Sequence, residues 1–268
     1  MKASTFQRGD TRLAVARTGK GKTFVFQHGL CGTASQPAEV FPNDIGWSCV
    51  TLECRGHGLS QSGNREQYSF SQFADDVSAY IESMNVGPVL VGGISMGAAT
   101  AMRVAVTHPE LVSGLVVARP AWIDRSAPDN LSPNREVARL LAAYEPAEAL
   151  SRFKASPTAA RLKRDAPDNL ASLIGFFSAP RMADTQALLL AIASDGPGIS
   201  RDEIARLRGR TLVIGHARDA VHPIAMAQEI ADLIPNAQFV EITPKADSPE
   251  NYRAEFRDAL RRFMTEIE

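Results

Sequence analysis

The segment from residue 88 to residue 109 most constrains the fold of this chain, because it joins an apolar run to a tight turn. PVLVGGI (88–94) has the length and continuous apolarity of a buried strand, and SMGAATAMRVAVTHP (95–109) follows as an alanine-rich helix. The junction reads GISMG (93–97), which is the pattern G-x-S-x-G in the strand–turn–helix context that gives this pattern its meaning. Its two glycines leave room for a sharp turn. We therefore predict Ser95 as a nucleophile at a helix N-terminus.

The rest of the chain alternates between strand-like and helix-like segments. Residues 4–17 have the pattern of a hairpin, and SFSQFADDVSAYIESMN (69–85) is strongly amphipathic at helical spacing. The further apolar runs are TFVFQ (23–27), GWSCVTLE (46–53), GLVVAR (114–119), TLVIGH (211–216) and AQFVEIT (237–243). Continuous apolar strands that alternate with helices indicate an α/β fold with a parallel sheet covered on both faces.

Composition excludes several classes of function. The 268 residues are 44% hydrophobic and carry a net charge of -1. A protein that binds nucleic acid or a membrane surface normally carries an excess of basic residues, so this charge argues against both kinds of partner. Cys31, Cys49 and Cys54 have no metal-binding spacing and are expected to be free thiols. The N-terminus lacks an apolar signal sequence, and no apolar run reaches the ~18 residues of a membrane helix. We expect a soluble cytoplasmic protein that needs no metal and no cofactor.

Residues 124–200 interrupt the alternation. They contain no clear strand but several short helical stretches, so we interpret them as a helical insertion and not as a linker. The sequence APDNL occurs in them twice, at 127–131 and at 166–170. Two such short matches do not define a repeat architecture, and we interpret both as ordinary helix starts.

The ordered set of motifs resembles the alpha/beta-hydrolase superfamily over nearly the whole chain. HGLC (28–31) follows the third expected strand, RGHGLS (55–60) follows the fourth, and GISMG follows the fifth. This resemblance implies a mostly parallel eight-stranded sheet, with residues 1–123 and 201–268 as the core and 124–200 as a helical cap. It also implies that the backbone N–H groups of Leu30 and Met96 form an oxyanion hole.

The same resemblance assigns an acid but leaves the base open. Asp219, the last residue of GHARD (215–219), follows the seventh strand, where the superfamily carries its acid. The superfamily's histidine belongs after the eighth strand, where ITPKADSPE (242–250) contains none. His222 is the first candidate for the general base, followed by His216 and Lys245, and the base could also be absent.

The remaining polar candidates also have more than one interpretation. Either Asp219 or Asp247 could orient His222, because a triad is defined by geometry and not by sequence order. His28, His57 and His108 are interpreted as structural. Cys31 could be a second nucleophile, although a small buried residue in a tight loop fits it better.

Two residues after the sixth strand are candidates for substrate binding. Arg119 could clamp a substrate carboxylate or, as we prefer, pair with Asp124 or Glu53. Trp122 is expected to line or close the side of the site toward the cap. The sequence leaves the oligomeric state open.

The expected activity is hydrolysis of a small, partly apolar ester, thioester or lactone through an acyl-enzyme at Ser95. One alternative within this class is a C–C bond hydrolase acting on a keto acid. A second is a ligand-binding member of the fold that has lost its base, and a third is a cofactor-free lyase or oxygenase. Fold alone does not choose among them.

Overall fold

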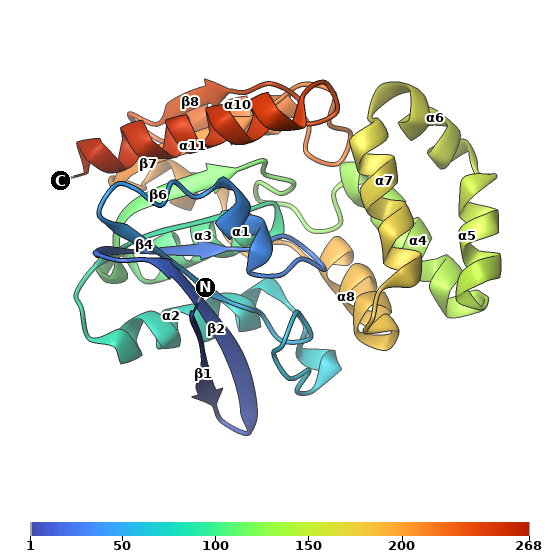
Figure 1. The fold of residues 1–268 in the computed structure, drawn as a ribbon, viewed down its shortest axis with the longest axis horizontal. Coiled ribbons are helices and arrows are strands. Elements are labelled where there is room, and N and C mark those ends of the chain that lie inside the picture. Colours follow the sequence, from blue (N-terminus) through green and yellow to red (C-terminus); the bar gives the residue numbers. More distant parts are fainter. Residues whose placement is uncertain (1, 268) are drawn as a thin grey trace.

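The computed structural model describes residues 2–267, which form one eight-stranded sheet with helices on both sides (Figure 1). The strands are β1 (Lys2–Arg8), β2 (Thr11–Gly19), β3 (Lys22–Gln27), β4 (Trp47–Leu52), β5 (Val89–Ile94), β6 (Val112–Ala118), β7 (Arg210–Gly215) and β8 (Gln238–Glu241). Their order is β1-β2-β4-β3-β5-β6-β7-β8. The β1–β2 and β2–β4 pairs are antiparallel and all others are parallel, which confirms the predicted fold.

Two separate hydrophobic clusters show that both faces of the sheet are covered. One face packs against α2 (Phe70–Met84), α3 (Met96–Thr107) and α10 (Ile224–Leu233). The other packs against α1 (Ser35–Val40) and α11 (Pro249–Glu266), whose buried stripe comprises Tyr252, Phe256, Leu260 and Phe263. Along β3 to β7, hydrophobic side chains on one side of the strand enter the first cluster and those on the other side enter the second, as a doubly covered sheet requires. The short helix α9 (Arg201–Ala205) leads into β7.

Five α-helices lie within residues 124–200, which follow β6. They are α4 (Ser132–Ala143), α5 (Pro146–Lys154), α6 (Pro157–Asp165), α7 (Pro167–Gly175) and α8 (Met182–Ser194). They pack on one another through a cluster of their own and form a group beside the sheet (Figure 1). Among residues 2–267, none of the helices combines the length and the apolarity needed to cross a bilayer.

Both APDNL segments begin helical turns, as predicted. The first leads into the 3₁₀ turn Asp129–Leu131, and the second begins α7. The last predicted helix is also present, since Ser248 caps α11 by accepting a hydrogen bond from the backbone N–H of Asn251.

Candidate functional site

Ser95 lies at a strained turn between β5 and α3. Its backbone has φ 58° and ψ -114°. Residues other than glycine rarely adopt a positive φ of this kind. A Cβ at Gly93 would lie 2.1 Å from the carbonyl carbon of Gly97, and one at Gly97 would lie 2.5 Å from the carbonyl oxygen of Gln27. Both motif glycines are therefore required by close backbone approach, and the turn leaves the Ser95 side chain partly exposed.

His222 contacts the Ser95 hydroxyl. Its Nε2 lies 2.8 Å from Ser95 Oγ, while its Nδ1 lies 2.9 Å from both carboxylate oxygens of Asp219. A nitrogen that faces a carboxylate must carry the ring proton, so the lone pair of the neutral ring lies on Nε2 and points at Ser95. The three side chains therefore have the geometry in which a histidine can remove a proton from a serine.

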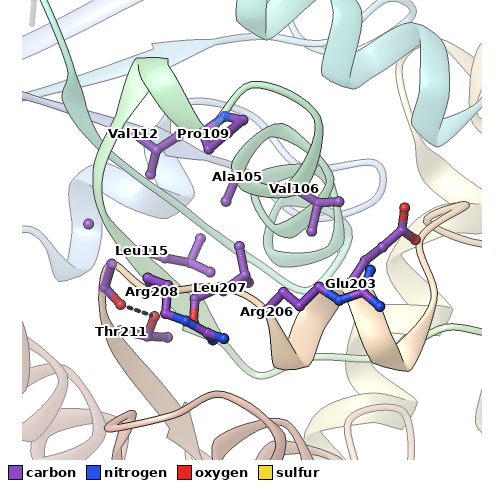
Figure 2. Close-up of a pocket in the computed structure, with 12 residues that line it drawn as sticks. Ala105, Val106, Pro109, Val112, Leu115, Glu203, Arg206, Leu207, Arg208 and Thr211 are labelled. Carbon is purple, nitrogen blue, oxygen red and sulfur yellow. Dashed lines mark hydrogen bonds between the residues drawn. The ribbon is translucent and has the colours of Figure 1, made fainter.

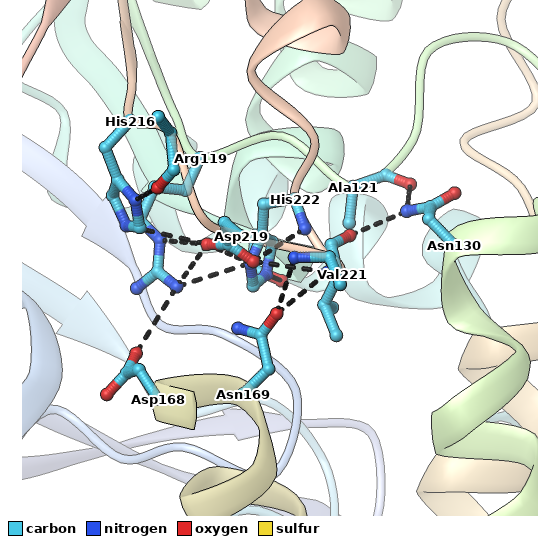
Figure 3. Close-up of polar contacts among 12 residues, drawn as sticks. Arg119, Ala121, Asn130, Asp168, Asn169, His216, Asp219, Val221 and His222 are labelled. Atoms are coloured by element: carbon cyan, nitrogen blue, oxygen red, sulfur yellow. Dashed lines mark hydrogen bonds and ion pairs between the residues drawn. The ribbon is translucent and has the colours of Figure 1, made fainter. Parts of the chain in front are cut away.

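Asp219 is held as a carboxylate by its surroundings. Its side chain is fully buried and accepts hydrogen bonds from the backbone N–H groups of His222 and Val221. Arg119 donates to Oδ2 from Nη2 at 2.6 Å and from Nε at 3.1 Å (Figure 3). Burial acts to raise the pKa of Asp219, but its contacts with His222 and Arg119 outweigh this effect and hold the pKa well below the usual range.

The ion pairs expected for Arg119 were wrong. Its partner is Asp219, with Tyr252 Oη at 3.4 Å and the Asp168 carboxylate at 3.9 Å, whereas Asp124 and Glu53 contact other groups. The reason is geometric, because Arg119 begins the loop after β6 with φ 46° and this loop lies beside the loop that follows β7. Burial lowers the pKa of the Arg119 guanidinium, and the charge of Asp219 more than reverses this effect.

The other candidate bases lie elsewhere. His216 is buried, with Nδ1 2.7 Å from its neighbour's carbonyl oxygen and Nε2 3.5 Å from Asp219, and burial and the charge of Arg119 lower its pKa. Lys245 Nζ lies 5.9 Å from the centre of the Tyr252 ring. Asp247 forms an exposed ion pair with Arg218. Across residues 2–267, none of these three candidates makes a hydrogen bond to Ser95 or His222.

The loop after β3 is braced by His28. Its Nδ1 donates to the Gly29 carbonyl at 2.9 Å, and its Nε2 accepts from the Cys54 N–H at 3.1 Å. Burial lowers the pKa of His28, consistent with a neutral ring that uses one nitrogen as donor and the other as acceptor. Within the described residues, the N–H groups of Leu30 and Met96 donate no hydrogen bond to another part of the chain.

A cavity of about 450 Å³ opens at Ser95. Its lining includes His222, Arg119, Trp122, Leu30 and Cys31, together with residues of α4, α7 and the turn after α7. The lining mixes apolar side chains with a few polar groups, which is typical of a small-molecule site. The Cys31 thiol lies 4.0 Å from a backbone carbonyl, and loss of solvent raises its pKa, which disfavours the reactive thiolate.

A second cavity, of about 410 Å³, lies at the opposite edge of the sheet (Figure 2). It is bordered by the residues where β6 and β7 begin, and its charged groups are Glu203, Arg206 and Arg208. It contains none of the candidate site residues. Nowhere in residues 2–267 do three His, Cys, Asp or Glu side chains gather in a way that could hold a metal ion.

The sequence interpretation missed the asparagines around the Ser95 cavity. Asn130 and Asn169, one from each APDNL segment, both bind the backbone of Val221, next to His222 (Figure 3). The repeat of APDNL drew attention to these two asparagines, but their contacts depend on the distant loop after β7. Asn134 also lines the cavity, and its Oδ1 is buried without a hydrogen-bond partner among the described residues.

Comparison with known proteins adds a family and several neighbours. The family model described as alpha/beta hydrolase fold matches residues 22–247. A Mycobacterium tuberculosis protein provisionally described as the non-heme bromoperoxidase BpoC is 29% identical over 230 residues, which cover 84% of this chain and 86% of that protein. Its crystal structure superposes with a TM-score of 0.72 at 25% identity and 96% coverage of both chains.

Two further solved structures share the fold at lower identity. The enol-lactonase of Burkholderia xenovorans LB400 has a TM-score of 0.73 at 20% identity, with 98% of this chain and 100% of that chain covered. A thermophilic esterase of Thermogutta terrifontis with bound malate has a TM-score of 0.72 at 22% identity, with 98% and 99% covered.

Proposed function

Because this chain belongs to the alpha/beta hydrolase fold family, we propose that it is a serine hydrolase of small, partly apolar esters, thioesters or lactones. The observation that carries this proposal is the 2.8 Å contact between His222 Nε2 and Ser95 Oγ, together with the 2.9 Å contacts of His222 Nδ1 to Asp219. We also propose that residues 124–200 act as a cap over a core of 1–123 and 201–268, since residues of α4 and α7 line the cavity at Ser95.

In the proposed reaction, His222 Nε2 takes the proton of Ser95 as Oγ attacks the substrate carbonyl carbon. The oxyanion that forms accepts hydrogen bonds from the backbone N–H groups of Leu30 and Met96, each contributing about 3–4 kcal/mol of transition-state stabilisation. The bond from the carbonyl carbon to the leaving oxygen or sulfur then breaks, and His222 gives its proton to that atom as the acyl-enzyme forms. An alcohol or thiol departs, whereas the oxygen of a lactone ring remains on the acyl chain as a hydroxyl. Asp219 stabilises the positively charged imidazole during both proton transfers.

Water completes the cycle by the same route. His222 removes a proton from a water molecule, whose oxygen attacks the acyl carbon and forms a second oxyanion. Collapse of this oxyanion breaks the bond to Ser95 Oγ, which takes the proton back from His222. The products are the carboxylic acid and the restored Ser95 hydroxyl.

The cavity and the neighbours support a substrate of modest size. A volume of about 450 Å³ with mixed lining suits a small acyl or lactone group, and Trp122 and Arg119 are proposed to contact it. The names of the esterase and the enol-lactonase agree with such substrates, although their identities to this chain indicate the fold alone. The alternative of a ligand-binding protein was based on the lack of a histidine base. His222 lies within hydrogen-bond distance of Ser95, so this reason no longer applies.

The proposal is tested with p-nitrophenyl esters of two to eight acyl carbons and a serine-directed fluorophosphonate. The wild type should turn over the esters, and peptide mapping should place one phosphonate per chain on Ser95. Ser95→Ala and His222→Gln should each lower kcat by about 10³-fold or more. His108→Gln serves as the matched control, since His108 is half-exposed and follows the last residue of α3, at the opposite end of that helix from Ser95. Full turnover in His222→Gln, or labelling on Cys31, would contradict the proposal.

A further inference from the structure

We infer that Asn130 and Asn169 are positioning residues that hold the loop carrying His222 from two sides. Asn130 Nδ2 donates to the carbonyl oxygens of Val221 at 2.7 Å and of Ala121 at 3.0 Å. Asn169 Oδ1 accepts from the N–H groups of Ala220 at 2.7 Å and of Val221 at 3.0 Å (Figure 3). Both polar groups of Val221, the residue directly before His222, are thus bound by side chains of the helical segment 124–200.

The two asparagines use opposite ends of their amides. Asn130 faces two carbonyl oxygens, so the group that meets them must be the donating NH₂. Asn169 faces two N–H groups, so the group that meets them must be the accepting oxygen. The backbone partners therefore fix the orientation of each amide, and no ambiguity between nitrogen and oxygen remains. Val221 and Asn169 are both buried, so water cannot readily replace the contact between them if it is lost.

The His222 loop needs such support because of its own sequence. Pro223 follows His222 and has no N–H with which to anchor the next peptide. On the other side, Asp219 is the only residue of this loop whose side chain binds the N–H of His222 in the described structure. The Val221 peptide is therefore the point at which the rest of the chain can fix the His222 backbone.

This inference rests on the proposed function, because it concerns the placement of His222 relative to Ser95. Misplacement of a reacting group by about 1 Å can lower a rate about 10²-fold. Loss of either asparagine contact removes one of the bonds that hold the Val221 peptide and lets His222 leave its 2.8 Å distance to Ser95 Oγ more often. The helical segment would thereby control how often the base is in place, through contacts that do not touch the substrate's reacting atoms.

The opposite amide requirements provide the test. Asn169→Asp keeps an acceptor for the two N–H groups, whereas Asn130→Asp places a carboxylate against two carbonyl oxygens. The same substitution should therefore be tolerated at position 169 and harmful at position 130. Asn130→Leu and Asn169→Leu each remove the amide and with it both hydrogen bonds of that asparagine. Both leucine variants should therefore lower the rate. The measurements are kcat, KM, the rate of Ser95 phosphonylation by the fluorophosphonate, and the thermal midpoint.

We expect Asn169→Asp to keep kcat and the phosphonylation rate within about threefold of the wild type. Asn130→Asp and the two leucine variants should lose about 10- to 100-fold in both rates, with smaller changes in KM. Phosphonylation is informative because it needs an activated Ser95 but no particular substrate. If the two asparagines only stabilised the fold, the variants would differ in thermal midpoint, but Asn130→Asp and Asn169→Asp would have the same kcat and phosphonylation rate.

Several results would overturn the inference. Equal rates for Asn130→Asp and Asn169→Asp would show that it does not matter which asparagine donates and which accepts. If Asn130→Asp failed to fold, the Asn130 contact would be needed for the fold and not specifically for the position of His222. Unchanged rates in both leucine variants would exclude any effect on His222. Failure of the proposed function looks different, because the wild type itself would then show neither turnover nor labelling at Ser95.

Discussion

Asp219 and His222 lie three residues apart in one loop, and Nδ1 of His222 is 2.9 Å from each carboxylate oxygen of Asp219. The same carboxylate also accepts from the backbone N–H of His222. Asp219 thus holds both the imidazole ring and the backbone of His222 in place. The order Ser95, Asp219, His222 along the chain is still the order typical of this fold, although the histidine precedes β8 instead of following it.

The first prediction concerns which carboxylate orients His222. Asp219→Asn should lower kcat by about 10³- to 10⁴-fold, because an amide no longer selects the ring tautomer with its lone pair toward Ser95. Asp247→Asn is the matched control, since Asp247 pairs with Arg218 at the surface. Its kcat should equal that of the wild type. Ester turnover measures both, and a large loss in Asp247→Asn with a small one in Asp219→Asn would reverse the assignment.

The second prediction concerns Arg119 and Asp219. Arg119→Met leaves a buried carboxylate without its cation, so the free energy of unfolding should fall by about 3–5 kcal/mol. The double variant Arg119→Met with Asp219→Asn removes both charges and should be more stable than Arg119→Met alone. Urea denaturation of the four proteins in this cycle gives the coupling energy between the two residues. A coupling near zero would show that the 2.6 Å contact does not contribute to stability.

The sequence could predict those features that depend on local pattern. The strand–helix alternation specified the sheet, and GISMG specified its own turn, because two glycines are the local solution to a close backbone approach. The proximity of His222 to Ser95 was predictable only as a hypothesis, since it followed from the lack of a later histidine. Both residues belong to loops at the same edge of a parallel sheet, where the carboxyl ends of the strands meet.

The features that escaped prediction depend on contacts between distant segments. Arg119 was assigned to Asp124 or Glu53 because a sequence shows which charges exist but not which loops are adjacent. The two asparagines of APDNL looked like helix starters because that local role is common for asparagine. Their second role requires the loop after β7 to lie against the helical segment, and nothing local in APDNL encodes that contact.

The third prediction concerns pH and three buried histidines. Burial is the main cause that lowers the pKa of His28, His57 and His216. Below about pH 6.5 the unfolded chain binds protons that these folded side chains do not, so stability falls as pH falls. Each histidine that stays neutral contributes a slope of about 1.4 kcal/mol per pH unit.

His57 gives the sharpest measurement, because its pKa lies well below the usual range. Urea denaturation at pH 7, 6 and 5 should show a shallower loss of stability in His57→Asn than in the wild type, by about 1.4 kcal/mol per pH unit. His108→Asn is the matched control, as His108 is half-exposed. Identical slopes for all three proteins would mean that His57 is not held neutral by the fold.

The fourth prediction concerns the glycines at Ser95. Gly93→Ala places a Cβ 2.1 Å from the carbonyl carbon of Gly97, where only backbone could move aside. The free energy of unfolding should fall by more than about 4 kcal/mol, and a chain of ordinary stability would fold poorly. Gly175→Ala is the control, because nothing lies within 4 Å of its added Cβ and it ends α7. That variant should be equal to the wild type or up to about 1 kcal/mol more stable, since alanine has the higher helix propensity. Thermal and urea denaturation would measure both, and a well-folded Gly93→Ala protein would show that the turn at Ser95 can open without loss of the fold.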